Sequence, residues 1–162
     1  MKTNQKNIYF EIKNWLNEYN KFVINERIDP NYYFSFWIWP KEDQYLIPVL
    51  VGNLKESLNG RNCILVGWGW NLNLEDDIIK RVINNPIMRT NFVRELRNKI
   101  EPDDLIINFY PEEQNFFSIK VSSIFPLDYV NKQLLFNEIV KVLIVWGKVN
   151  IEFQRQADIN FT

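Results

Sequence analysis

Residues 32–39 read YYFSFWIW, a run that is almost entirely aromatic or β-branched and that ends at Pro40. Residues of these types are enriched in strands because they pack well on a pleated surface. Two similar runs follow at residues 44–51 and 62–70, and the polar residues 41–43 form a hairpin-length loop before the first of them. Three strands in succession along the chain predict an antiparallel meander.

Upstream of this sheet, apolar residues recur at spacings of three and four, which is typical of one face of an α-helix. The residues with this spacing are Ile8, Ile12, Trp15, Leu16, Tyr19, Phe22 and Val23. They predict an amphipathic first helix that runs to Val23 and ends before the breaker Asp29-Pro30-Asn31.

Downstream of the three strands, the sequence predicts a helix in two pieces. Asn73 is a suitable N-cap, and the acidic residues 75–77 after it favour the positive end of a helix dipole. Pro86 ends or kinks the first piece, because proline lacks the backbone N–H that a helix interior needs. Pro102 closes the second piece.

Residues 105–110 and 116–124 predict a second hairpin, joined around residues 111–114. Pro126 and Asp128 then open a long last helix that continues to about Arg155. Its residues 139–146 are apolar on more than one side, which indicates a helix that is buried or that packs on another molecule.

The expected order of elements is therefore α-β-β-β-α-β-β-α. This order predicts an α+β fold, with helices packed on a five-stranded antiparallel sheet. The chain has 162 residues, which is the length of one ordinary domain, so we expect residues 1–162 to form a single domain.

Composition excludes most catalytic templates. The sequence has no histidine and one cysteine, Cys63, so it lacks the residues for a histidine-based triad, a zinc cage or an internal disulfide. Acidic clusters at residues 75–77 and 101–104 are more typical of helix capping than of catalysis or Mg²⁺ binding. We therefore expect no enzyme activity, no catalytic residue, no metal and no cofactor.

Charge and hydropathy bear on partners and location. The formal net charge is −1, so no overall positive field draws the chain to nucleic acid. The N-terminus runs into an amphipathic segment, and the longest apolar run is far shorter than the roughly 20 residues of a membrane span. These features predict a cytoplasmic protein with no membrane partner.

One basic run interrupts this pattern. Arg89, Arg94, Arg97 and Lys99 lie close together in the second helical piece. Such a run favours either a phosphate-binding patch or a solvated helix face, and the solvated face is the more common case. A nucleic-acid or nucleotide-associated regulator that uses residues 89–99 is therefore the alternative function.

The tryptophans are the strongest candidates for binding. Alternation along a strand puts Trp37 and Trp39 on one face of the first strand, and Trp68 and Trp70 on one face of the third. We expect Trp68 to be part of the core. Trp37, Trp39 and Trp70 lie nearer strand ends, where they either complete the core or form an aromatic platform for a partner protein.

The chain resembles a family of uncharacterised proteins grouped with the type III secretion chaperone-like fold. The stretches that carry the resemblance are residues 64–72 (ILVGWGWNL), 92–97 (FVRELR), 116–124 and 142–146. Secretion chaperones of this fold are homodimers that hold an extended client segment against apolar surface. The resemblance thus implies a non-enzymatic, chaperone-like or adaptor module that binds a partner protein. For such a module, the strand faces described above make Trp37, Trp39 and Trp70 the candidate binding residues.

Overall fold

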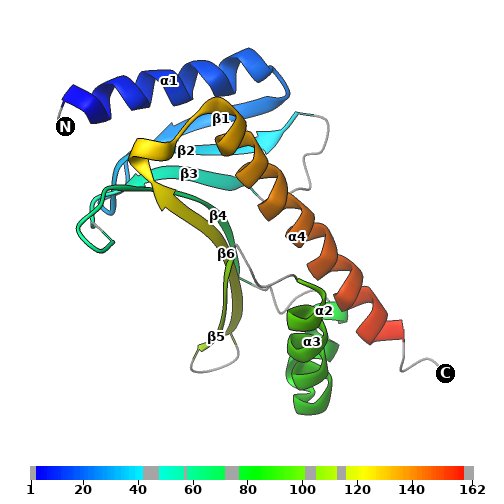
Figure 1. The fold of residues 1–162 in the computed structure, drawn as a ribbon. Helices are drawn as coiled ribbons and strands as arrows, with labels where there is room; N and C mark the ends of the chain where they lie inside the picture. The colour runs from blue at the N-terminus through cyan, green and yellow to red at the C-terminus, as the bar shows by residue number, and fades with distance from the viewer. Residues whose placement is uncertain are drawn as a thin grey trace. The chain divides into compact units, whose positions relative to one another are not determined.

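The computed structural model describes residues 3–41, 48–56, 58–71, 77–100, 105–112 and 116–158. These residues form an α+β fold of four α-helices, one short 3₁₀ helix and six strands (Figure 1). In chain order the elements are α1 (Thr3–Tyr19), β1 (Phe22–Arg27), β2 (Tyr32–Pro40), β3 (Val49–Leu54), β4 (Cys63–Asn71), α2 (Asp77–Asn84), α3 (Pro86–Lys99), β5 (Ile106–Glu112), β6 (Phe116–Pro126), η1 (Leu127–Tyr129) and α4 (Lys132–Asp158).

The strands form one antiparallel sheet in the order β1-β2-β3-β4-β6-β5. The predicted meander is present as β2, β3 and β4, which pair in sequence. The predicted count of five strands is wrong, because β1 adds a sixth at the edge. Residues 42–47, which include part of the predicted strand at 44–51, lie outside the described residues, and β3 runs three residues beyond the predicted end.

The additional strand comes from the end of the predicted first helix. Helix α1 ends at Tyr19, and Asn20 follows with a φ of 50°, in the left-handed region that asparagine tolerates better than most residues. Phe22 and Val23 fit the helical spacing, yet they begin β1. Strand β1 pairs with β2 along its whole length, from Phe22 opposite Pro40 to Arg27 opposite Ser35.

The predicted break at Pro86 is confirmed, whereas the start of the last helix differs from the prediction. Helices α2 and α3 are separate, and α3 starts with Pro86 directly after Asn85, whose side chain accepts hydrogen bonds from the backbone N–H groups of Ile87 and Met88. The last helix begins later than predicted, because η1 precedes it. The Asn131 side chain accepts a hydrogen bond from the N–H of Leu134 and so caps α4. The predicted cap Asn73 lies outside the described residues.

The chain divides into two compact units, each with its own core. The first comprises residues 1–68 and 122–140, and the second residues 69–121 and 141–162. In the first unit, Ile12 and Leu16 of α1 are fully buried together with one face of the sheet. In the second, the ring of Phe92 in α3 packs on that of Phe153 in α4, with 4.1 Å between centroids.

Within the described part of the chain, no helix combines the length and the hydropathy that crossing a membrane requires.

Candidate functional site

Cross-strand register identifies a sheet face in the first unit that is turned away from α1. The ring of Tyr9 in α1 stacks on Phe36 of β2 at 5.5 Å and meets Phe34 edge-on, so these two side chains point towards α1. Because side chains alternate along a strand, Ser35 and Trp37 point to the opposite side. We call this opposite side the outer face.

The outer face is built from two rows of directly paired residues. The first row runs across four strands as Asn25, Trp37, Leu50 and Gly67, and the second as Arg27, Ser35, Gly52 and Leu65. Trp39 continues the face beyond the first row, opposite Val23 of β1. The structure therefore brings the two candidate residues of β2 together on one surface.

Trp37 and Trp39 are both half-buried. The guanidinium group of Arg27 lies over the ring of Trp37, 5.4 Å from its centroid, which is a cation–π arrangement. Fully buried aromatic residues of β2, such as Phe36, are instead on the α1 side. The position of Trp37 and Trp39 away from α1 leaves part of each residue exposed to solvent.

The tryptophans of β4 have different surroundings. Trp68 is buried in the first unit, with 3% of its surface exposed, as the sequence predicts. Trp70 belongs to the second unit and is half-buried there. Its ring meets Trp146 and Phe153 of α4 edge-on, at 4.7 and 5.6 Å. Packing in the second unit accounts for Trp70 without a partner.

A groove of about 580 Å³ lies beside the outer face in the first unit. Its walls are the start of α1 (Lys6, Tyr9 and Phe10), residues 26–30, residues 32–35 and Lys55. This volume is in the range of pockets that bind small ligands or single side chains of a partner. Arg27 and Ser35 belong both to the groove and to the outer face, so the two surfaces are continuous.

The groove has apolar walls that are exposed to solvent. Among its lining residues, Phe10 is 49% exposed, Tyr33 is 40% exposed and Ile28 is fully exposed. Tyr32 lies over Gly52, and a Cβ atom built on Gly52 would be 2.5 Å from the ring of Tyr32. The absence of a side chain at Gly52 therefore leaves room for the ring of Tyr32 against β3. Exposed apolar side chains that gather around one concavity are typical of an interaction site.

Carboxylates in the groove already have partners within the protein. Glu26 accepts hydrogen bonds from the Tyr9 hydroxyl and from the ammonium group of Lys13, at 2.5 and 3.0 Å (Oε1 and Oε2). The hydrogen bonds from Tyr9 and then Lys13 hold the pKa of Glu26 below its usual value. Asp29 accepts a hydrogen bond from the backbone N–H of Asn31 at 2.8 Å.

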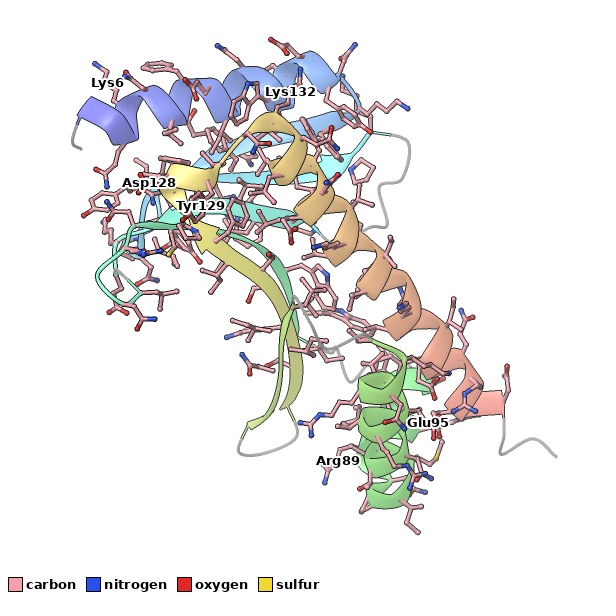
Figure 2. All side chains as sticks on the ribbon, in the orientation of Figure 1. Lys6, Arg89, Glu95, Asp128, Tyr129 and Lys132 are labelled. Atoms are coloured by element: carbon pink, nitrogen blue, oxygen red, sulfur yellow. The ribbon has the colours of Figure 1, made fainter. Side chains whose placement is uncertain are left out.

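The cations that line the groove, Lys6, Arg27 and Lys55, have no acidic partner among the described residues. Lys6 lies on the first turns of α1 (Figure 2), and it makes no hydrogen bond or ion pair within the part of the chain that the structure describes. Arg27 interacts through its guanidinium group with the ring of Trp37. Lys55 donates a hydrogen bond to the backbone carbonyl of Pro30 at 2.7 Å.

Strand β1 is at the edge of the sheet, next to the groove. It pairs with β2 on one side, and no other described strand pairs with it on its second side. Four of its six residues are exposed, including the last three. An edge strand presents a row of N–H and C=O groups that an extended peptide can satisfy.

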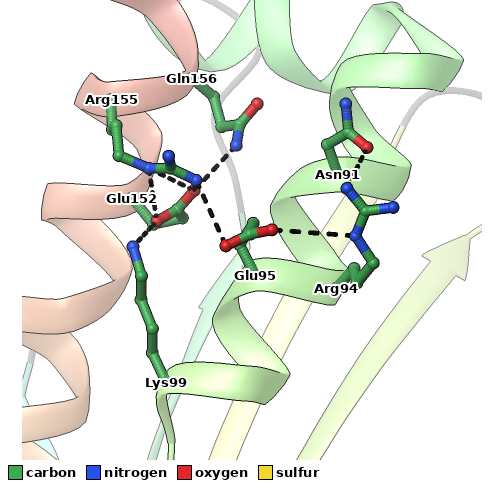
Figure 3. A network of polar contacts seen from close by, with 7 residues as sticks. All are labelled: Asn91, Arg94, Glu95, Lys99, Glu152, Arg155 and Gln156. Carbon is green, nitrogen blue, oxygen red and sulfur yellow. Dashed lines mark hydrogen bonds and ion pairs between the residues drawn. The ribbon is translucent and has the colours of Figure 1, made fainter.

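The predicted basic patch is only partly available. Lys99 forms an ion pair with Glu152 of α4, and Arg94 contacts Glu95 at 3.8 Å (Figure 3). At about 3.6 residues per turn, Arg89, Arg94 and Lys99 point in different directions from α3. Arg89 is exposed on α3 (Figure 2). These cations do not form one continuous positive surface.

Glu152 is the centre of a polar cluster in the second unit. Its carboxylate is fully buried and accepts hydrogen bonds from Lys99, Arg155 and Gln156 (Figure 3). Burial acts to raise the pKa of Glu152, but the hydrogen bonds from Arg155, Gln156 and Lys99 outweigh it and lower the pKa to about 2. The cluster joins α3 to α4, and its groups are satisfied by one another.

Sequence reasoning missed the groove and the Glu152 cluster. The groove depends on β1, which the helical spacing of Phe22 and Val23 concealed. The alternation of Phe22 and Ile24 with Val23 and Asn25 was the available signal for that strand. The partners Lys99 and Glu152 are far apart in the sequence, and no local pattern joins them. Of the acidic clusters, residues 75, 76, 101, 103 and 104 lie outside the described residues.

No family model matches the chain, and no curated protein matches it in sequence. Solved structures do share its fold. An uncharacterized protein from Methanothermobacter thermautotrophicus is similar with a TM-score of 0.73 and 19% identity, over 92% of this chain and 98% of that one. YbjN from E. coli, described as "a putative transcription regulator", is similar with a TM-score of 0.52 and 10% identity, over 86% of this chain and 89% of that one. At these identities the likeness shows the fold alone.

Proposed function

We propose that this chain is a non-enzymatic, chaperone-like or adaptor module that holds an extended segment of a partner protein. The observation that carries the proposal is the combination, in one compact unit, of an edge strand with half-buried tryptophans on the adjoining face. Main-chain groups of β1 would bind the backbone of the segment, and Trp37 and Trp39 would bind its apolar side chains.

Two further features support this proposal. Trp and Arg are the residue types that contribute most to protein interfaces, and here Arg27 lies against Trp37 on the surface proposed to bind. The sequence also resembles the family grouped with secretion chaperones, which hold client segments, although the sheet here has an additional edge strand. Trp70 is not part of the proposed site, because it packs on Trp146 and Phe153.

Selection from a library of random peptides displayed on phage tests the proposal. The wild-type chain is expected to enrich a set of related peptides, and the variant that combines Trp37→Ala with Trp39→Ala is expected to lose them. Tyr129→Ala is the matched control, because Tyr129 is 63% exposed in η1 and lies outside the groove and the outer face (Figure 2). This control should keep the selected peptides.

The comparison requires both variants to be folded. Circular dichroism and urea unfolding check this. If the double variant unfolds, Arg27→Glu replaces it, because Arg27 is exposed and its substitution leaves both rings in place. The proposal is wrong if the folded wild type selects no peptide, or if the folded variants on the outer face select the same peptides as the wild type.

The alternative function is a nucleic-acid or nucleotide-associated regulator that uses residues 89–99. The description of YbjN as "a putative transcription regulator" favours it, whereas the ion pairs of Lys99 and Arg94 with carboxylates disfavour it. Binding to duplex DNA that falls steeply with added salt and that is lost in Arg89→Glu would support the regulator instead.

A homodimer is a separate part of the proposal. Ile144 and Ile151 of α4 are 54% and 64% exposed, and Gly147 lies between them with open space around it. In an antiparallel pair of α4 helices, Ile144 of each copy would fill the space at Gly147 of the other. Analytical ultracentrifugation of the wild type and of Ile144→Lys tests this pairing, and a wild-type monomer at high concentration would exclude it.

A further inference from the structure

We propose that the groove beside β1 selects segments in which an acidic residue lies next to an aromatic or bulky apolar one. This inference rests on the proposed function and specifies the chemistry of the partner. It is carried by three properties of the groove. Its apolar walls are exposed, and its carboxylate Glu26 is paired with Lys13. Its cations Lys6, Arg27 and Lys55 have no acidic partner among the described residues and outnumber the one carboxylate without a cation, Asp29.

The apolar walls define the first requirement of the occupant. Phe10, Ile28 and Tyr33 are exposed around a concavity of about 580 Å³. Covering these side chains would remove apolar surface from water, which is the main favourable contribution to most protein association. An aromatic or bulky aliphatic side chain has the size and the chemistry to do this, whereas a small polar one does not.

The charges define the second requirement. Glu26 is neutralised by Lys13 and hydrogen-bonded to Tyr9, so it repels an incoming carboxylate only weakly. Lys6 and Arg27 supply donors without an acidic partner among the residues that the structure describes. The guanidinium of Arg27 lies over the ring of Trp37, and a guanidinium group can bind a carboxylate through two parallel N–H groups. A basic segment would meet these two cations unfavourably.

The position of the groove favours a peptide as its occupant over a small anion. It lies at the end of the exposed edge strand, whose last residues Glu26 and Arg27 also line the groove. An extended segment that pairs with β1 would therefore carry its side chains directly to Lys6 and Arg27. A free anion would use the cations but would leave the row of main-chain groups unsatisfied.

The test compares peptide selections on charge variants of the folded, full-length chain. The random library selected on the wild type is expected to show an excess of Glu or Asp next to Phe, Tyr, Trp or Leu. Selection on Lys6→Glu is expected to lose the acidic preference. Lys80→Glu in α2 is the matched control, because Lys80 is also exposed and lies in the other unit. It should keep the preference.

Titration of the most enriched peptide gives the size of the effect. Lys6→Glu should weaken its binding by about tenfold, and added salt should weaken wild-type binding more than binding to the variant, which keeps Arg27 but lacks the cation of Lys6. A selected set of peptides without acidic residues, or with the same acidic excess on Lys6→Glu, overturns the inference while the proposed function stands. A wild type that selects no peptide overturns the proposed function as well.

Other occupants would also overturn the inference. If a nucleotide displaces the selected peptide and binds with equal affinity on its own, the groove is a small-anion site. If Lys6→Glu instead abolishes a concentration-dependent dimer, the occupant of the groove is a second copy of this chain.

Discussion

The two Trp-x-Trp pairs of this chain share one spacing but have different surroundings. Trp37 and Trp39 lie on the outer face of β2, half-buried, with the cation of Arg27 over one ring. Trp68 on β4 is buried in the core of the first unit, and Trp70 packs on α4 in the second. Alternation along a strand therefore determines which residues share a face, whereas the helices determine which face is covered.

The largest expected effect is at Trp68. Because its side chain is buried, Trp68→Ala should lower the free energy of unfolding by about 3–5 kcal/mol, through lost burial and the cavity that remains. Urea unfolding at constant m-value measures this change. Trp68→Phe should have a much smaller effect. A loss below about 1 kcal/mol for Trp68→Ala would break the contrast between the two pairs.

The second largest effect is expected from acid, which should lower the stability of the second unit by protonating Glu152. The pKa of Glu152 is about 2 in the folded chain and 4.5 as the reference value, so the carboxylate stabilises the fold fully above about pH 4.5. That contribution, about 3 kcal/mol, is lost as the pH falls towards 2. Urea midpoints between pH 5 and 2 should therefore fall in the wild type and fall less in Glu152→Gln. Equal slopes in both proteins would contradict the role of the cluster.

Trp70→Ala should have an intermediate effect. Its ring is half-buried and makes two edge-on contacts with Trp146 and Phe153, so we expect a loss of about 1–2 kcal/mol. Peptide selection by this variant should be unchanged, which sharpens the distinction from Trp37. If the folded Trp70→Ala chain no longer selects peptides, Trp70 is a binding residue after all.

The smallest effect on stability is expected at the outer face. Arg27→Gln removes one cation–π contact at an exposed site, which is worth about 0.5–1 kcal/mol. The same substitution should change the emission of Trp37, which a Trp37→Phe background can verify. The free energy of peptide binding should change more than the free energy of unfolding. A larger change in the free energy of unfolding would show that Arg27 is chiefly structural.

The sequence was a good guide where the pattern was local. Runs of β-prone residues located β2, β4, β5 and β6, and Pro86 separated α2 from α3. The buried Trp68 was predicted correctly. Strand β1 was not, because Phe22 and Val23 satisfy a helical spacing that the left-handed turn at Asn20 interrupts.

The candidate site was harder to predict than the fold. The faces of Trp37 and Trp39 followed from alternation, but their exposure depends on where α1 packs. The groove forms only where α1, β1 and β2 pack together, and no local sequence pattern predicts that packing. The Glu152 cluster depends on Lys99 and Arg155 reaching the same carboxylate from two helices.

The exposed edge of β1 also affects how the chain behaves before it meets a partner. Unpaired strand edges are where identical chains join into aggregates. Here the strand is short, and its last three residues, Asn25, Glu26 and Arg27, are polar and exposed. Short, charged edges disfavour such joining, so we expect Glu26 and Arg27 to oppose aggregation of the unpartnered chain. Replacing both residues by valine should make the edge uncharged and β-prone, and we expect such a variant to form fibrils more readily.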